Sequence, residues 1–197
     1  MARKNLYFII HKPFKVLSQF TNEGDNIGLK EVFPDLPKDV YPVGRLDLDS
    51  EGLLILTNDK SLNNKLLNPN HGHSRTYWIE VDGSPDAASL DQLRKGVEIK
   101  VNGKAHRTKP AKVEVIRPNI GERIPPVNYL KHPNRTWLQI SLTEGKNRQV
   151  RRMTAKVGHP TLRLIRIAIE GLSLEPLKSG EITQISEKVI YKKLNLL

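Results

Sequence analysis

The sequence predicts an α+β protein in which strands outnumber helices. Apolar segments rich in β-branched residues recur along the chain, two of them alternate with a period of two, and helical patterns with clear start signals are few. The chain has 197 residues, which is enough for one domain or two small lobes. Because no shift in composition divides the chain, we expect a single catalytic or binding domain over residues 1–197.

Strand patterns occur from the beginning of the chain to its last third. Residues 53–57 are almost entirely apolar, as in a buried strand. In residues 75–82, Tyr77, Ile79 and Val81 fall on one face, and residues 136–143 alternate in the same way. The Asn-Gly pair within residues 101–104 predicts a tight hairpin. The other predicted strands are residues 6–10, 111–117 and 162–169.

Three segments are predicted to be helices: residues 60–67, 85–95 and 147–157. The first follows Asp59, a good N-cap residue, and the second follows Ser84 and ends at Gly96. The third ends at Gly158 and carries its apolar residues on one face. Residues 118–135 contain four prolines and are expected to form an extended surface loop.

The composition restricts the possible functions. Lys and Arg number 32 against 21 Asp and Glu, a net charge of +11, which favours nucleic acid as partner over an anionic membrane surface. Surplus lysine that only aids solubility is the alternative. Zero cysteines exclude a disulfide framework, a thiolate metal site and a thiol nucleophile. No apolar run is long enough for a membrane span or a signal peptide, so we expect a cytoplasmic protein.

An acidic segment with glycines lies directly before the buried strand at residues 53–57. Residues 44–52 read G-R-L-D-L-D-S-E-G and include Asp47, Asp49 and Glu51. A loop that is held rigidly on a strand is a favourable place for a catalytic side chain. Composition alone leaves open the alternative of an acidic turn with solvated carboxylates.

A basic segment covers residues 144–166, with seven Lys or Arg residues against one acid. Arg148, Arg152 and Lys156 are four residues apart on the predicted helix, where like charges repel by about 0.2–0.5 kcal/mol per pair. Solvent and counterions, RNA phosphate or a buried carboxylate must offset that repulsion. The sequence of this segment is compatible with all three of these partners.

These two segments resemble motifs of the RsuA-type pseudouridine synthases, a family that acts on ribosomal RNA. Residues 44–59 resemble its catalytic motif, and the other resembling segments follow in the family's order: residues 11–19, 75–77, 144–153 and 162–172. The resemblance implies a mixed, mainly antiparallel central sheet in two lobes flanked by helices, with the active-site cleft between the lobes. Since the first motif begins almost at Met1, we expect no separate N-terminal RNA-binding module.

The resemblance also implies a reaction, the isomerisation of a flipped-out uridine to pseudouridine without a cofactor. It assigns Asp47 as the nucleophile, Arg151 as its basic partner and Tyr77 as a residue that stacks on uracil and assists proton removal. Burial disfavours an ionised carboxylate, whereas a guanidinium within about 4–6 Å favours it. We therefore predict an ion pair between Asp47 and Arg151.

Further residues are expected to bind the substrate. The resemblance suggests that Arg45 holds the flipped nucleotide and that Leu164 lies against its base, with Ile165 as the competing choice. Asp49 and Glu51 are expected to structure the loop. The predicted phosphate contacts are Arg148, Arg152, Lys156 and Arg163. Details of the motifs are most similar to members that modify large-subunit (23S-type) rRNA, so we expect a monomer that acts on naked rRNA or an assembly intermediate.

Two other functions remain to be weighed. One is a basic rRNA-binding protein without catalysis, in which the acidic loop is structural. The other is a glycosidase that pairs Asp47 with Asp49 or Glu51, but carboxylates this close in one loop seldom lie on opposite sides of a sugar. His71 and His73 lack a completing carboxylate or cysteine set, so no metal site is predicted.

Overall fold

The computed structural model describes residues 4–197, and the chain divides into two compact units. Unit 1 combines Met1–His73 with Arg166–Leu197, and unit 2 is Ser74–Ile165. Strand β9 (Thr161–Ile169) therefore contributes its first residues to unit 2 and its last residues to unit 1. Within the described residues, no helix has the length and apolar character that a membrane span requires. Each unit is described below by itself.

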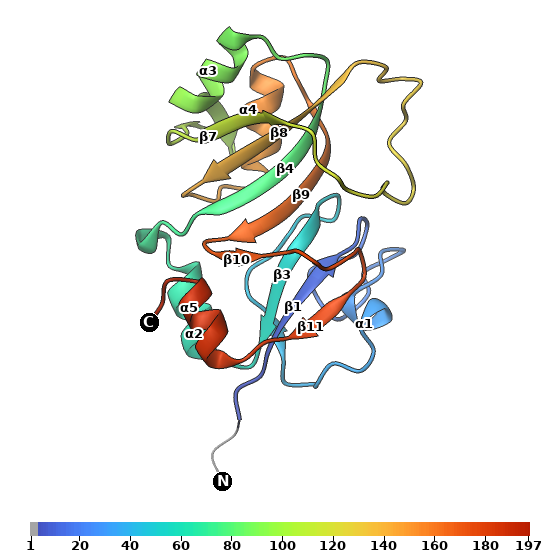
Figure 1. Cartoon of the computed structure of the whole chain (residues 1–197), viewed down its shortest axis with the longest axis vertical. Coiled ribbons are helices and arrows are strands. Elements are labelled where there is room, and N and C mark those ends of the chain that lie inside the picture. Colours follow the sequence, from blue (N-terminus) through green and yellow to red (C-terminus); the bar gives the residue numbers. More distant parts are fainter. Residues whose placement is uncertain (1–3) are drawn as a thin grey trace. The chain divides into compact units, whose positions relative to one another are not determined.

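Unit 1 is built on a sheet with strand order β11, β1, β3 and the end of β9 (Figure 1). Every residue of β3 is buried, as expected for a central strand covered on both faces. The registers of β1 with β3 and with β11 are antiparallel, and so is that of β10 with β9. The strands are β1 (Tyr7–Lys12), β2 (Tyr41–Pro42), β3 (Glu51–Thr57), β10 (Leu172–Ser173) and β11 (Ile182–Gln184).

Three helices and one 3-10 turn complete unit 1. They are α1 (Leu29–Val32), α2 (Lys60–Leu67), the turn η1 (Pro69–His71) and α5 (Glu187–Lys193). One apolar core joins α1 to the sheet, with Ile10, Leu29, Phe33 and Leu54 among its buried members. Leu46 belongs to the same core and so anchors the acidic loop from within.

The Asp59 carboxylate connects distant segments of unit 1. Its Oδ1 accepts from the Ser61 and Leu62 amides and caps α2, and its Oδ2 accepts from the hydroxyls of Tyr7 (2.8 Å) and Tyr191 (2.7 Å). Burial raises the pKa of Asp59, but the bonds from the tyrosines and amides outweigh burial and lower it below its usual range. Burial and the same carboxylate raise the pKa of Tyr191 to about 12.

We expect Asp59→Ala to lower the free energy of unfolding by about 2–4 kcal/mol, because a helix cap and the partners of two hydroxyls are lost. The lowered pKa gives stability that is present above the unfolded pKa and lost as pH falls through the folded pKa. Urea unfolding between neutral and acidic pH should therefore show a steeper loss in the wild type than in Asp59→Ala. Parallel pH curves for the two proteins would contradict this role.

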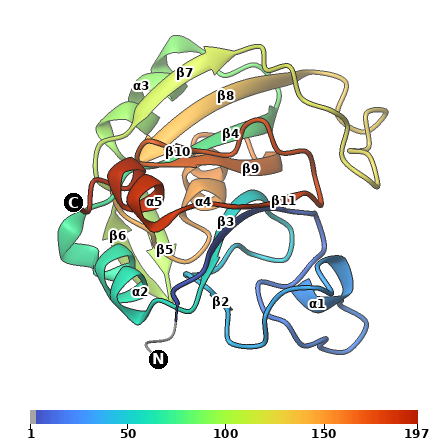
Figure 2. The same cartoon turned by 60° about the horizontal axis from the view of Figure 1, so that its bottom comes forward.

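Unit 2 consists of a sheet, a separate hairpin and two helices (Figures 1 and 2). The sheet order is β7, β8, β4 and the start of β9, and β8 pairs antiparallel with both β4 and β7. The elements are β4 (Arg75–Asp82), α3 (Ala87–Lys95), β5 (Glu98–Val101), β6 (Lys104–Arg107), β7 (Lys112–Ile116), β8 (Arg135–Leu142) and α4 (Gln149–Lys156). Ile79, Leu138, Ile140 and Met153 are fully buried in its core.

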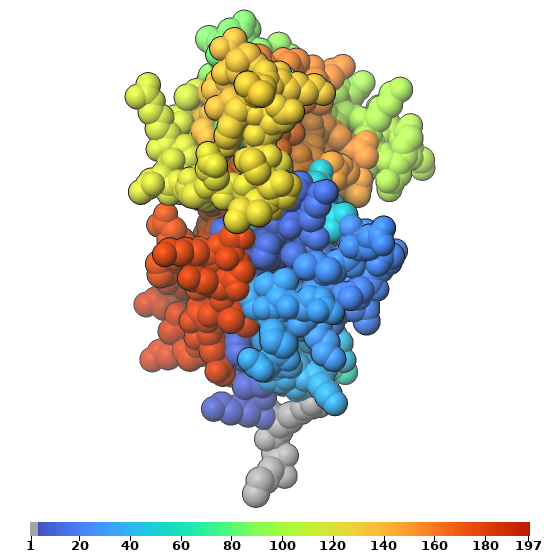
Figure 3. All heavy atoms as spheres, turned by 90° about the vertical axis from the view of Figure 1, so that its right-hand side faces the viewer, coloured from blue at the N-terminus to red at the C-terminus, as the bar shows by residue number. Residues whose placement is uncertain are grey.

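The predicted α+β class and the mainly antiparallel pairing are confirmed. Among the predicted helices, α4 begins at Gln149 rather than at Asn147, and the predicted start of α3 was wrong as well. It begins at Ala87 with Asp86 as its cap, because the Asp86 carboxylate accepts from the Ser89 amide, whereas Ser84 lies outside the helix. Residues 118–134 form the predicted loop without helix or strand. Figure 3 shows this loop in yellow on the surface of unit 2.

Candidate active site

The loop that carries Asp47 is held by the segment that follows β1. The Ser18 hydroxyl donates to the Leu46 carbonyl (2.8 Å) and accepts from the Leu46 amide (2.9 Å). The Lys15 amide donates to the Leu48 carbonyl at 2.9 Å, and the Ser50 amide closes a turn on the Asp47 carbonyl at 3.0 Å. The segment after β1 is therefore hydrogen-bonded to the acidic loop, and these bonds fix the backbone on both sides of Asp47.

The side chains of this loop differ in exposure. Ser50 and Glu51 are buried, Asp47 and Asp49 are half-buried, and Arg45 is exposed. A half-buried carboxylate on a fixed backbone is positioned but still reachable, which is what a nucleophile requires. The loop thus combines one buried carboxylate, that of Glu51, with two residues, Asp47 and Asp49, that are partly accessible.

Lys12, at the end of β1, supplies positive charge to the acidic loop. It is fully buried, and its Nζ donates to the carbonyls of Pro13 (2.8 Å) and Val16 (2.6 Å). Burial lowers the pKa of Lys12 to about 8, although the negative charges of Glu51, Asp49 and Asp47 favour its ammonium form. Lys12 therefore offsets part of the loop's negative charge from inside unit 1.

Gly52 permits a close approach between β3 and β9. Its φ is +109°, and an added Cβ would lie 2.3 Å from the Arg166 carbonyl oxygen and 2.7 Å from the Arg166 nitrogen. Arg166 is itself buried and donates from Nε to the Leu53 carbonyl at 2.8 Å. At the end of the acidic loop, β3 consequently approaches Arg166 of β9 through a contact that only glycine allows.

In unit 2, Glu144 and Gln149 shape the loop before α4. Glu144 Oε1 accepts from the Lys109 amide and from Gln149 Nε2, both at 2.7 Å, and Gln149 Oε1 accepts from the Lys146 amide at 2.9 Å. Burial raises the pKa of Glu144, but the bonds from Lys109, Gln149 and His106 outweigh burial and lower it. The loop between the two residues is left exposed.

The predicted basic residues of α4 differ in their surroundings. Arg148 and Lys156 are exposed at the two ends of the helix, and Arg148 has a left-handed φ of +51°. Arg151 is half-buried and donates from Nη1 to the Thr161 carbonyl at 3.3 Å. Arg152 donates to the Lys100 carbonyl and, at 3.1 Å, to Asn147 Oδ1. The helix therefore presents cations along its length, as its residue spacing predicts.

The remaining predicted residues of unit 2 lie on β4 and β9. Tyr77 is half-buried on β4 and packs against the apolar core, and Leu164 is a buried member of that core. Arg163 is only 5% exposed and donates to the Gly121 carbonyl at 2.7 Å, with its guanidinium 5.9 Å from the Trp137 ring centre. Among the predicted phosphate-binding cations, Arg163 is thus the least accessible.

The predicted site residues come from both units. Arg45 and Asp47 belong to unit 1, and the other seven belong to unit 2. The ion pair between Asp47 and Arg151 therefore stays a prediction. In the described part of the chain, no group of three His, Asp or Glu residues could hold a metal ion. The sequence is consistent with two histidines in a surface loop, but only His71 is exposed. His73 is buried, and its Nδ1 lies 3.4 Å from Glu170 Oε1.

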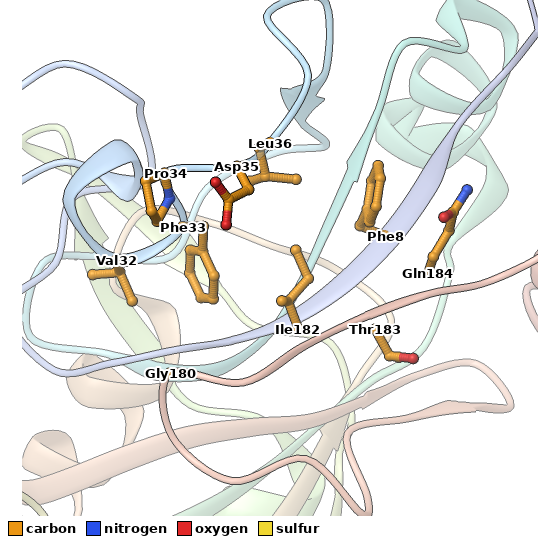
Figure 4. Close-up of a pocket in the computed structure, with 10 residues that line it drawn as sticks. All are labelled: Phe8, Val32, Phe33, Pro34, Asp35, Leu36, Gly180, Ile182, Thr183 and Gln184. Carbon is orange, nitrogen blue, oxygen red and sulfur yellow. The ribbon is translucent and has the colours of Figure 1, made fainter.

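A pocket in unit 1 contains none of the predicted site residues. It is lined mainly by apolar side chains from β1, from α1 and the residues that follow it, and from β11, among them Phe8, Phe33 and Ile182. Asp35 also lines it (Figure 4). Ile182 is 38% exposed, so the pocket opens to solvent. Its apolar lining is unlike the charged motifs described above.

Sequence reasoning assigned no role to Lys12 and Glu144, although both lie in the resembling segments. For Lys12 the signal was a lysine at the end of an apolar strand, directly before a proline. For Glu144 it was the single acid within a strongly basic segment. A charge at the end of an apolar strand, or a single acid among bases, often has structural partners, and here both residues have several.

Comparison with known proteins defines the class. The family described as RNA pseudouridylate synthase matches residues 6–156, and the chain belongs to this family. It is 50% identical over 179 residues to "Ribosomal large subunit pseudouridine synthase E" of Vibrio parahaemolyticus, covering 90% of this chain and 72% of that protein. The protein of the same name from Xanthomonas axonopodis pv. citri is 45% identical over 171 residues, covering 86% and 88% of the two chains.

A solved structure confirms the fold. A crystal structure of a pseudouridylate synthase has a TM-score of 0.77 with 26% identity, covering 97% of this chain and 74% of that chain. The predicted fold class and the enzyme class are therefore confirmed: the chain is an α+β RNA pseudouridine synthase.

Proposed function

We propose that the protein converts a specific uridine of large-subunit ribosomal RNA to pseudouridine, with Asp47 as the nucleophile that acts on a flipped-out uridine. The names of the relatives at 45–50% identity support the substrate. The observation that carries the role of Asp47 is its position, half-buried on a backbone that Ser18 and Lys15 fasten on both sides. We also propose that the chain acts as a single catalytic domain, that it is a monomer and that it is located in the cytoplasm.

The reaction breaks the N1–C1′ bond, turns the uracil and forms a C5–C1′ bond, while the proton leaves C5 and N1 gains one. No electrons are gained or lost, and this proposal assigns nucleophilic attack and proton transfer to side chains, so it invokes no cofactor. A carboxylate can attack C1′ or the uracil ring and later leave, and either course requires it to be ionised. Tyr77 stacks on the uracil and its hydroxyl assists proton removal from C5.

Substrate binding is assigned to residues that surround the nucleotide in this proposal. Arg45 holds the phosphate of the flipped nucleotide, and its exposure supports that role. Leu164 supplies an apolar contact to the base, while Arg163 remains a predicted phosphate contact despite its burial. Extruding the uridine costs a few kcal/mol, and phosphate contacts from Arg148, Arg152 and Lys156 offset that cost.

Arg151→Lys should reduce turnover by about 10²-fold. A guanidinium stays charged when it is desolvated and offers a planar pair of donors, whereas a desolvated ammonium loses its proton more readily and has no such pair. Single-turnover rates measure the effect, with thermal unfolding as the control for folding. Full turnover in Arg151→Lys would instead assign Arg151 to phosphate binding.

The proposal is tested by incubating the protein with ribosomal RNA and mapping pseudouridine chemically. We expect one modified position in large-subunit RNA when the substrate is naked RNA or a precursor particle, and none in mature subunits. Tight binding without any product would favour a non-catalytic rRNA-binding protein. Release of free uracil would favour the glycosidase alternative.

A further inference from the structure

The β5–β6 hairpin of unit 2 has one packed face and one exposed face. In its register Ile99 lies opposite His106, and Ile99 is buried in the core of unit 2. Side chains alternate along a strand, so Lys100 and Arg107 lie on the other face, and both are exposed. Lys104 is exposed beside the Asn-Gly turn. The hairpin thus displays three cations to solvent.

These hairpin cations, Lys100, Lys104 and Arg107, lack acidic partners. The hairpin contains one acid, Glu98, against the three cations. Across residues 4–197, the ion pairs include none of these three side chains. Their charge therefore does not stabilise the hairpin internally and is available to an anionic partner.

Glu144 fastens the hairpin to the loop that precedes α4. Its Oε2 lies 3.1 Å from Nε2 of His106 on β6, and its Oε1 accepts from the Lys109 amide just beyond β6 and from Gln149 at the start of α4. Arg152 of α4 also donates to the Lys100 carbonyl on β5. The hairpin and α4 are consequently tied into one piece within unit 2 (Figure 2).

Because the hairpin and α4 are connected in this way, two groups of cations lie on the same part of unit 2. The exposed Lys146 and Arg148 lie in the loop that Glu144 shapes, next to the hairpin that Glu144 fastens. Exposed cations on two connected segments can engage more phosphates than the single nucleotide in a catalytic site offers. Such an arrangement fits the repeated phosphates of a nucleic-acid strand, which position a protein without reading sequence.

We propose that the hairpin cations, together with Lys146 and Arg148, bind the phosphate backbone of RNA that flanks the target uridine. This inference rests on the proposed function, because it assigns the partner to the RNA that carries the target. The exposed face favours RNA over other partners. It offers Lys100, Ala105, Arg107 and, opposite Arg107, the single acid Glu98. It has no aromatic or large aliphatic anchor of the kind used for protein interfaces or membrane insertion.

The test compares two variants that each lose three positive charges. The hairpin variant is Lys100→Gln, Lys104→Gln and Arg107→Gln, and its control replaces three exposed lysines of α5 in unit 1. The control substitutions are Lys188→Gln, Lys192→Gln and Lys193→Gln. Dissociation constants for an rRNA fragment are measured over a range of potassium chloride concentrations. The salt slope of the hairpin variant should fall by about 2–3, with affinity at low salt falling at least about tenfold, while the control keeps the wild-type values.

The outcomes separate this inference from the proposed function. A hairpin variant with the affinity and salt slope of the control overturns the inference, even if the wild type makes pseudouridine. A wild type that makes no pseudouridine overturns the proposed function, whatever the salt slopes are. If the triple variant does not fold, Lys104→Gln at the exposed turn decides the question, because its slope should fall by about 1.

Discussion

Asp47→Asn should reduce pseudouridine formation by at least about 10⁴-fold, because the amide cannot act as the nucleophile. The substitution keeps the size of the side chain, and the bonds that fix this loop come from the backbone and from Ser18. We therefore expect the folded structure and RNA binding to persist. Single-turnover assays with rRNA, followed by chemical mapping of the modified position, measure the effect.

Asp49→Asn is the matched control, because it removes the same charge from the same loop. Both carboxylates are half-buried, and both contribute negative charge near Lys12. We expect Asp49→Asn to keep turnover within about tenfold of the wild type, since only a supporting interaction is lost. Equal losses in the two variants would show that the negative charge of the loop, rather than a nucleophile at Asp47, supports the reaction.

Gly52→Ala should lower the free energy of unfolding by about 3 kcal/mol or more. The new Cβ would lie 2.3 Å from the Arg166 carbonyl oxygen, and the φ of +109° is unfavourable for any L side chain. The obstacle is backbone rather than the end of a flexible side chain, so β3 and β9 would have to separate. Urea unfolding of purified protein measures the loss.

Gly24→Ala is the control that separates the cost of a left-handed backbone conformation from the cost of a steric clash. Gly24 also has a positive φ, +55°, but an added Cβ would meet nothing within 4 Å. We expect a cost of about 1 kcal/mol, the usual penalty for a left-handed residue. If the two alanine variants unfolded at the same urea concentration, the contact between Gly52 and Arg166 would not be a determinant of stability.

The sequence predicted the elements whose side chains alternate or repeat clearly. The bounds of β4 and α2 match the prediction, because apolar residues alternate in the sequence of β4 and Asp59 caps α2 as expected. Strand β11 was missed, since all three of its residues are exposed and it forms only by pairing with β1. The short helix α1 and helix α5 were missed as well, although Ser186 gives α5 a recognisable cap.

In the candidate site, too, local sequence patterns predicted some features, whereas contacts between residues far apart in the chain were not predictable. The spacing of Arg148, Arg152 and Lys156 predicted a basic helix, and α4 carries these residues at its start, middle and end. The bond between Ser18 and Leu46 joins residues 28 positions apart, so no local pattern could have revealed it. The burial of Arg163 likewise depends on the loop around Gly121, which lies 42 positions away.

The discontinuity of unit 1 has a consequence for biosynthesis. Its sheet includes β1 and β3 from the first part of the chain and β11 from the last, and Tyr191 of α5 reaches Asp59. During translation the contiguous unit 2 has all its residues before unit 1 does. The N-terminal strands of unit 1 therefore cannot complete their sheet until β11 and α5 have been synthesised and have left the ribosome.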